Sequence, residues 1–207
     1  LEMLQALAET PKPAAGSAQA RHLETLIKAY ETAESLFVAG HGQTGLGIAY
    51  PYVADQMRGA YLDVPDLMTR SHPVRTAQDA RNYVTRLAAF PDAIDDERRR
   101  LNADAAAGVI APDFILRRMA VLATEMGAGP AETHILVGTL DSLLGGPEDL
   151  SAEERDALAL RARELVETGI LPAYERFADD LIKLAARAPS EPGVWQLPEG
   201  NAYYDAA

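Results

Sequence analysis

Since the chain contains no cysteine, its histidine and carboxylate side chains are the first candidates for binding a metal ion or exchanging a proton. The four histidines are far apart in the sequence: His22, His41, His72 and His134. No two of them stand four residues apart, so no helix face would present a pair of imidazoles, and no His-Glu-x-x-His motif occurs. The sequence therefore predicts no metal site built from this chain alone.

The other candidates for chemistry are carboxylates and a glycine cluster. Asp55, Asp63 and Asp66 are close in sequence, but a chain with 31 acidic residues contains many such groups. The glycines of residues 42–47 lack the Lys-Ser/Thr ending and the strand-to-helix context of a phosphate-binding loop, so we expect a turn there. The Gly-x-Ser-x-Gly motif of serine hydrolases is absent as well. We therefore predict no catalytic residue in this chain.

Composition and charge exclude several classes of function. The 207 residues carry a formal net charge of −12 without a basic stripe, which argues against a nucleic-acid partner. The lack of cysteine excludes disulfides and thiolate chemistry. No apolar run has the length of a membrane span. Since the first residue is Leu1 and not Met, we expect a processed or truncated chain with any targeting segment removed.

The clearest scaffold element is a long amphipathic helix from Ser151 to Arg187. Ser151 followed by Glu154 is typical of a capping box at a helix start. Apolar residues then recur at spacings of three and four: Leu158, Ala162, Leu165, Val166, Ile170, Tyr174, Phe177, Leu181 and Leu184. Pro172 lies inside this pattern, and we expect it to kink the helix near Gly169 without ending it. A stripe of this length needs partner helices.

Apolar spacing, together with proline and glycine at the ends, predicts further helices. We expect them at residues 18–38, 76–107, 112–126 and 131–144, with a short candidate at 1–8 and a linker at 11–17. Pro91 is expected to interrupt the second of these. The fold class is therefore all-α: an irregular bundle of about seven to eight helices with a long kinked helix near the C-terminus. Residues 1–17 form an N-terminal segment and linker, and residues 18–207 form the helical part.

Three local features complete this prediction. Thr76 and Asp79 repeat the capping-box pattern. The charge run 95–100 is typical of a solvated helix face with ion pairs at spacings of three and four. His22 and His134 are predicted on helix surfaces.

The segment from Tyr50 to Pro73 has the least ordinary composition, because it contains three prolines and three tyrosines, Tyr50 included. Short helical turns joined by tight corners fit it best. Such a segment is either a packed connector or part of the wall of a groove. Hydrogen-bonding groups on it would either bind a peptide backbone or satisfy their own turns.

Several stretches of the sequence resemble one bacterial family. The first runs Gln-Met-Arg-Gly-Ala-Tyr-Leu-Asp-Val-Pro-Asp-Leu from Gln56 and continues to His72-Pro73. The second covers residues 76–91, and the third reads Gly-Val-Trp-Gln-Leu-Pro-Glu-Gly-Asn-Ala-Tyr-Tyr from Gly193. Residues 108–114 and 171–174 also match in kind and order. Over residues 50–204 the chain resembles the domain-of-unknown-function 885 family.

This resemblance implies a predominantly helical protein similar to zinc metallopeptidases of the gluzincin type, periplasmic or exported and in some members lipid-anchored. The family's metal-binding histidines and glutamates lie after the Trp-x-Leu-Pro-x-Gly-x-x-Tyr-Tyr stretch. The resemblance therefore implies that residues 18–207 are the helical N-terminal half of a larger protein. Zinc is expected in the full-length protein, with its ligands outside this chain.

Six residues of the matched stretches are candidates for lining a substrate cleft: Gln56, Tyr61, Asp66, Trp195, Tyr203 and Tyr204. The three aromatic residues near the C-terminus are amphipathic and follow the last long helix, so they would either line the cleft, anchor the C-terminal half or pack in a core. We expect Val194 and Leu197 to share with them an exposed apolar surface that meets the C-terminal half.

Two functions are consistent with the sequence. The first is a helical part of a zinc-dependent peptidase that helps to form the substrate cleft, with the C-terminal half of the same protein and a peptide substrate as partners. The second is a stand-alone, non-catalytic helical module that binds or interacts with another molecule. A reading frame that continues into a His/Glu metal motif favours the first, and a stop codon favours the second.

Overall fold

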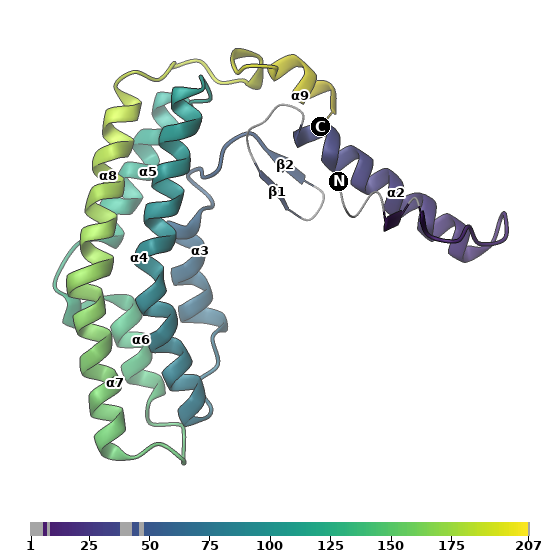
Figure 1. Ribbon diagram of the computed structural model, residues 1–207. Coiled ribbons are helices and arrows are strands. Elements are labelled where there is room, and N and C mark those ends of the chain that lie inside the picture. Colours follow the sequence, from purple (N-terminus) through teal and green to yellow (C-terminus); the bar gives the residue numbers. More distant parts are fainter. Residues whose placement is uncertain (1–5, 8, 38–42, 46–47, 207) are drawn as a thin grey trace. The chain divides into compact units, whose positions relative to one another are not determined.

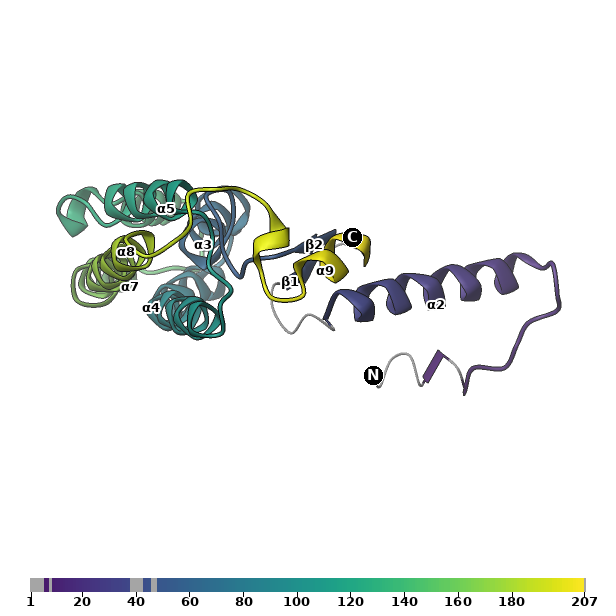
Figure 2. The ribbon, with the colours of Figure 1, turned by 90° about the horizontal axis from the view of Figure 1, so that it is seen from above.

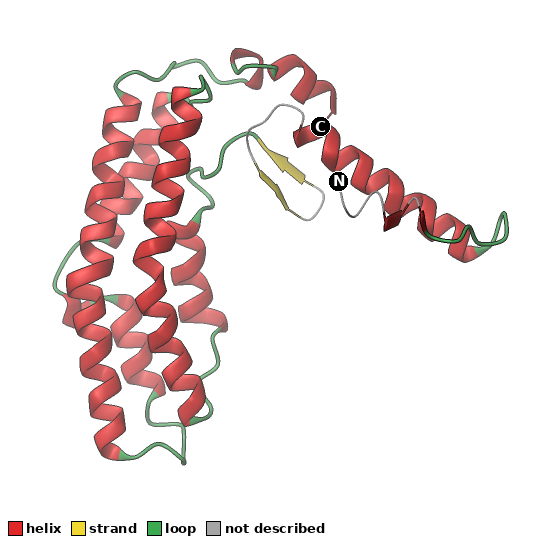
Figure 3. Ribbon diagram, in the orientation of Figure 1, coloured by secondary structure: helices red, strands yellow, loops and turns green. Residues whose placement is uncertain are grey.

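The computed structural model describes residues 6–7, 9–37, 43–45 and 48–206 (Figure 1). The chain divides into two compact units. One unit, the terminal unit, comprises Leu1–Val53, Ala106–Val109 and Glu191–Ala207; the other, the helical bundle, comprises Ala54–Ala105 and Ile110–Ser190. Regular structure in the described part of the chain is almost entirely helical (Figure 3), so the all-α prediction is confirmed.

The helical bundle contains helices that run side by side (Figures 1 and 2). Their bounds are α3 Ala60–Asp66, α4 Ala77–Ala106, α5 Asp113–Met126, α6 Ile135–Leu143, α7 Ala152–Leu165 and α8 Leu171–Ala185. A π turn, Leu67–Ser71, extends α3, and a 3-10 turn, Ala131–Thr133, precedes α6. α5 and α8 make the most extensive helix pair. Within the described residues, no helix is both long and apolar enough to cross a membrane.

The predicted long helix is continuous. α7 and α8 are joined by a π turn at Val166–Ile170, so that the helix runs unbroken from residue 152 to residue 185. The irregularity expected near Pro172 takes the form of this wide turn, which ends two residues before a proline that cannot donate a backbone hydrogen bond. With α7 and α8 counted as one, the described residues form seven α-helices, in line with the predicted number.

Helix starts follow the predicted capping residues. The backbone N–H of Asp79 donates to Thr76 Oγ1 at 3.2 Å, and the N–H of Thr76 donates to Asp79 Oδ2 at 3.1 Å, which completes a reciprocal capping box. Ser151 Oγ likewise accepts from the N–H of Glu154 at 3.2 Å. The Glu154 carboxylate, however, accepts from Arg81 Nε at 2.7 Å and so joins α7 to α4.

The expectation that Pro91 interrupts its helix was wrong, because α4 continues through it. Its ring lies against the π turn of the long helix: a Cβ added to Gly169 would lie 3.0 Å from Pro91 Cγ. The absence of a side chain at Gly169 lets the two irregular helix segments approach each other closely. Packing in the bundle therefore retains a helix that a proline alone would tend to break.

The core of the bundle combines aliphatic residues with tyrosines whose hydroxyls are all hydrogen-bonded. Its largest fully buried side chains are Tyr61, Tyr83, Tyr174, Phe90, Phe177, Met68, Leu87, Ile94, Leu116, Met119, Leu136 and Leu140. The hydroxyl of Tyr83 donates to the carbonyl oxygen of Leu136 at 2.9 Å, and that of Tyr174 donates to the carbonyl oxygen of Tyr61 at 2.6 Å. Each bond joins two helices and avoids a buried unpaired hydroxyl.

Ion pairs connect α4 to α8 at the edge of this core. Arg98 donates to Asp180 at 2.9 Å and to Asp95 at 3.1 Å, and Arg176 donates to Asp95 at 2.7 Å. The hydrogen bond from Arg176 lowers the pKa of Asp95, with Arg98 adding to the effect against the opposing influence of burial. The predicted pairing of the charge run 95–100 is therefore confirmed for Asp95 and Arg98.

The terminal unit contains α2 Ala18–Phe37, β1 Gln43–Gly45, β2 Ile48–Tyr50, a 3-10 turn Val194–Gln196 and α9 Gly200–Ala206. The N–H of Ala20 donates to Ser17 Oγ at 3.1 Å, so α2 begins directly after the predicted linker. The strands pair antiparallel over three residues each, which apolar spacing did not predict. His41, most of the predicted helix at residues 1–8 and several positions of the glycine cluster lie outside the described residues.

Two glycine substitutions test how tightly the start of α3 is packed. Gly59 has a φ of 134°, and a Cβ there would lie 2.8 Å from both Ala54 Cβ and Glu97 Oε2. Gly59→Ala should therefore lower the free energy of unfolding by about 2–4 kcal/mol. Gly138→Ala is the control, because Gly138 lies in α6 with no atom within 4 Å of the added Cβ; it should raise stability by up to about 1 kcal/mol. Urea unfolding followed by circular dichroism measures both, and equal effects would contradict this account.

Candidate functional site

Three of the sequence-predicted cleft residues lie at α3, where they occupy different environments. Tyr61 is fully buried, and its hydroxyl donates to the carbonyl oxygen of Asp55 at 2.8 Å, within its own turn. Asp66 is exposed and forms an ion pair with Arg70 at 2.9 Å. Gln56 is half-buried, and its Oε1 has no hydrogen-bond partner among the described residues. Of the three, Gln56 therefore retains an unused acceptor, but this oxygen is buried.

Glu97 of α4 lies beneath this turn and was missed by the sequence analysis. Its side chain is buried, and Oε2 accepts from the backbone N–H of Ala60 at 2.5 Å. Burial raises the pKa of Glu97 to about 7; hydrogen bonds from the N–H groups of Ala60 and Tyr61 oppose this shift, and the nearby Asp63 adds to it. Its other oxygen, Oε1, has no partner in the described part of the chain. This carboxyl group therefore changes its protonation near neutral pH.

Glu97 was wrongly assigned to a solvated face because the whole run 95–100 was read as exposed. A usable signal was nevertheless present in the sequence. Phe90, Ile94 and Leu101 are buried in α4, and Glu97 falls between them at the same spacing of four, three and four residues. A carboxylate in that stripe must face the core.

The described histidines do not form a metal site. His134 is buried, contrary to the predicted surface position; its Nδ1 accepts from the N–H of Leu136 at 3.3 Å and caps α6, and its Nε2 lies 3.0 Å from the carbonyl oxygen of Met126. Burial lowers the pKa of His134, which favours the neutral ring that this capping requires. His72 is also buried, with Nδ1 2.8 Å from the carbonyl oxygen of Pro73. No group of three or more histidines and carboxylates within the described residues could hold a metal ion.

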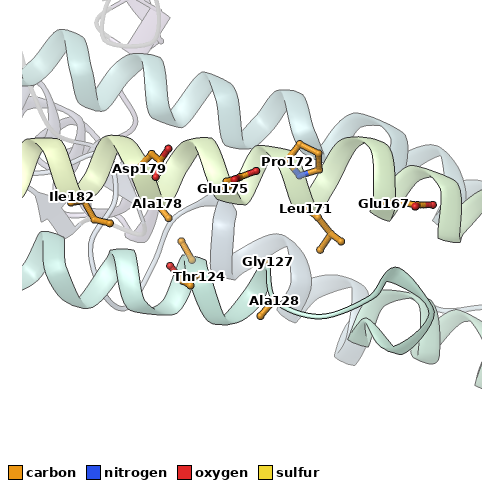
Figure 4. Close-up of a pocket in the computed structure, with 11 residues that line it drawn as sticks. Thr124, Gly127, Ala128, Glu167, Leu171, Pro172, Glu175, Ala178, Asp179 and Ile182 are labelled. Carbon is orange, nitrogen blue, oxygen red and sulfur yellow. The ribbon is translucent and has the colours of Figure 1, made fainter.

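A groove of about 440 Å³ lies between α5 and α8 (Figure 4). Its lining residues are Ala123, Thr124, Gly127, Ala128, Glu167, Leu171, Pro172, Glu175, Ala178, Asp179 and Ile182. The lining is mostly apolar, and on the α5 side it is made of small residues that keep the groove open. Ile182 is 57% exposed, which is unusual for a large aliphatic side chain next to a core.

Acidic residues give this groove a one-sided charge. Glu167, Glu175 and Asp179 are exposed and belong to no ion pair formed within the described residues. The adjacent Asp180 differs, because it pairs with Arg98 at 2.9 Å and with Lys183 at 3.2 Å. The groove thus combines an apolar lining with three carboxylates that have no cationic partner in the described part of the chain.

The C-terminal candidates belong to the terminal unit and divide into exposed and buried residues. Trp195 and Tyr204 are 64% and 73% exposed, whereas Tyr203 and Leu197 are buried. The expected exposure is therefore confirmed for Trp195 and Tyr204 and was wrong for Tyr203 and Leu197, while Val194 is half-buried. That these residues meet a C-terminal half stays a prediction. The six predicted cleft residues are divided between the two units, and their role in a cleft stays a prediction.

Replacement of Glu97 by glutamine should remove one source of pH dependence. The folded protein binds this proton more tightly than the unfolded chain, since its pKa rises from 4.5 to about 7 on folding. The free energy of unfolding contributed by Glu97 therefore falls as the pH rises from about 4.5 to about 7, and by linkage the loss is at most about 3 kcal/mol. Relative to the wild type, Glu97→Gln should gain ~2 kcal/mol between pH 5 and pH 8 in urea unfolding.

An exposed carboxylate provides the control for this measurement. Glu148→Gln alters a side chain on the surface and should show the same difference from wild type at both pH values. A Glu97→Gln difference that does not change with pH would rule out proton binding by Glu97 in this range.

Comparison with known proteins gives a fold match and a family match. No curated protein matches the sequence. The structure resembles one described as "the putative lipoprotein from Colwellia psychrerythraea", with a TM-score of 0.88 and 21% sequence identity. The match covers 99% of this chain but 35% of that chain, so at this level of identity it shows a shared fold with part of a larger protein. A model of a family described as "Bacterial protein of unknown function (DUF885)" matches residues 1–207, and the chain therefore belongs to the DUF885 family.

Proposed function

We propose that the chain is the helical part of a larger zinc-dependent peptidase and helps to form its substrate cleft. The observation that carries this proposal is the fold match, in which nearly all of this chain corresponds to about a third of a longer one. A peptidase function rests on the resemblance of the family to gluzincin-type zinc metallopeptidases. In this proposal the zinc ligands and the general base belong to the part of the protein outside residues 1–207.

The cleft role is assigned to residues with accessible groups. Trp195 and Tyr204 offer exposed aromatic faces with polar atoms at their edges, whereas the unpaired amide oxygen of Gln56 is buried and would need a side-chain movement to reach a peptide. Tyr61 and Tyr203 are each buried within their own unit, so they would have little contact with a peptide. Asp66, which is exposed, would contribute charge at the rim.

In the intact enzyme the zinc ion would polarise the scissile carbonyl and activate a water molecule. The described residues of this chain would bind and orient the peptide. We further propose that the protein is periplasmic or otherwise exported and lipid-anchored, a proposal supported by the name of the structural relative, "putative lipoprotein".

A non-catalytic helical binding module is the second candidate. The groove between α5 and α8 favours it, because all residues that line the groove belong to this chain. Binding there would require no residue from a longer protein.

The complete reading frame that encodes this sequence provides the test of the peptidase proposal. The expressed full-length protein should retain about one zinc ion per chain after dialysis and cleave members of a peptide library. A chelator should abolish cleavage, and added zinc should restore it. Elemental analysis and mass spectrometry of the products measure both properties.

The 207-residue chain serves as the matched control, and it should neither retain zinc nor cleave peptides. Zinc retained by this chain, with ligands traced to its own side chains, would contradict the proposal that the zinc ligands lie outside residues 1–207. A reading frame that ends with this sequence, or a full-length protein without zinc-dependent hydrolysis, would exclude the peptidase function.

A further inference from the structure

We propose that the groove between α5 and α8 binds a cationic peptide segment. Aliphatic side chains of the segment would enter the apolar part of the groove, and its lysines or arginines would pair with Glu167, Glu175 and Asp179. The inference does not depend on peptidase activity, because every residue involved lies in the helical bundle of this chain.

The apolar lining explains why an aliphatic side chain would enter. Leu171, Ala178 and Ile182 project from α8 toward α5, and Thr124 projects from α5 on the opposite side (Figure 4). Leu171 is half-buried and Ile182 is largely exposed, so both would lose contact with water on binding. Removal of apolar surface from water contributes roughly 25 cal/mol per Å², and a groove between two helices is a common binding site for amphipathic segments.

The negative charge beside the groove indicates what kind of ligand it would bind. Three carboxylates beside one groove that form no ion pair among the described residues favour a ligand that brings positive charge. A second copy of this chain, with its net charge of −12, would meet electrostatic repulsion, as would an anionic lipid surface or a nucleic acid. A metal ion is not favoured, because these carboxylates are not close enough to form a ligand group in the described structure.

The positions of the carboxylates determine the spacing of the positive charges. Glu175 and Asp179 are separated by one helical turn, about 6 Å along the helix axis. Glu167 lies eight residues before Glu175, roughly 12 Å away along the same axis. A segment that satisfies all three must therefore carry cations along a stretch of about 18 Å, as a peptide does and a single small ion does not.

Direct binding of a designed peptide to the 207-residue chain tests the proposal. The probe is a short fluorescein-labelled peptide with leucines on one helical face and lysines beside them, and fluorescence anisotropy gives its Kd. We expect saturable binding that weakens as salt is raised, since part of the attraction is electrostatic. A peptide with glutamates in place of the lysines should not bind.

Neutralisation of the three carboxylates separates the groove from the general acidity of the chain. The triple variant Glu167→Gln, Glu175→Gln and Asp179→Asn should weaken binding by about tenfold. The matched control neutralises three exposed carboxylates outside the groove by Asp92→Asn, Glu148→Gln and Glu153→Gln, and it changes the net charge equally. Weaker binding in the groove variant than in the control supports the proposal, and equal binding in both overturns it.

A steric variant tests the apolar part of the groove. Thr124→Trp fills the groove from α5, whereas Val121→Trp adds the same bulk to an exposed position of α5 outside the groove. We expect loss of binding in the first variant and wild-type affinity in the second, with circular dichroism showing that both remain folded. Unchanged affinity in a folded Thr124→Trp variant would overturn the proposal.

Discussion

Tyr174 joins four helices of the bundle, and the arrangement of the bundle depends on its contacts. Its hydroxyl donates to the carbonyl oxygen of Tyr61 in α3, and its ring meets Phe90 of α4 edge-on at a centroid distance of 5.9 Å. α5 approaches it so closely that a Cβ on Gly127 would lie 2.8 Å from Tyr174 Cβ. Burial raises the pKa of Tyr174, so its hydroxyl stays protonated as a donor. These contacts fix the separation of α5 and α8 and the position of α3.

The groove beside this contact is a consequence of the same packing. Gly127, which permits the close approach, is also part of the groove lining, together with small residues that follow and precede it. On α8 the residues of the groove form a stripe next to the buried one, and the π turn before Leu171 alters the angular position of the side chains that follow it. α8 is therefore buried against the core on one side and borders an open groove on the other.

The buried carboxyl group of Glu97 supports the turn at the start of α3, which contains some of the predicted cleft residues. Glu97 holds the backbone at the start of α3, where Gln56 and Tyr61 lie close by in the sequence. One oxygen of its carboxyl group is hydrogen-bonded, and the other has no partner in the described structure. Burial of this group disfavours the charged form and raises its pKa to about 7. Any peptide-binding role of this turn would thus depend on a residue that is itself out of reach of the peptide.

Local periodicity and end signals in the sequence determined the all-α class, the continuity of the long helix and the capping at Thr76 and Ser151, because helix formation depends on residues within three or four positions. Tertiary structure alone decided that α4 passes through Pro91, that His134 is a buried cap, and which acidic residues find partners. Asp180 pairs with an arginine 82 residues away, whereas its neighbour Asp179 lines the groove and forms no ion pair within the described residues. Both carboxylates lie within one helical turn of Lys183, and the packing of α4 against α8 brings Arg98 to Asp180 and not to Asp179.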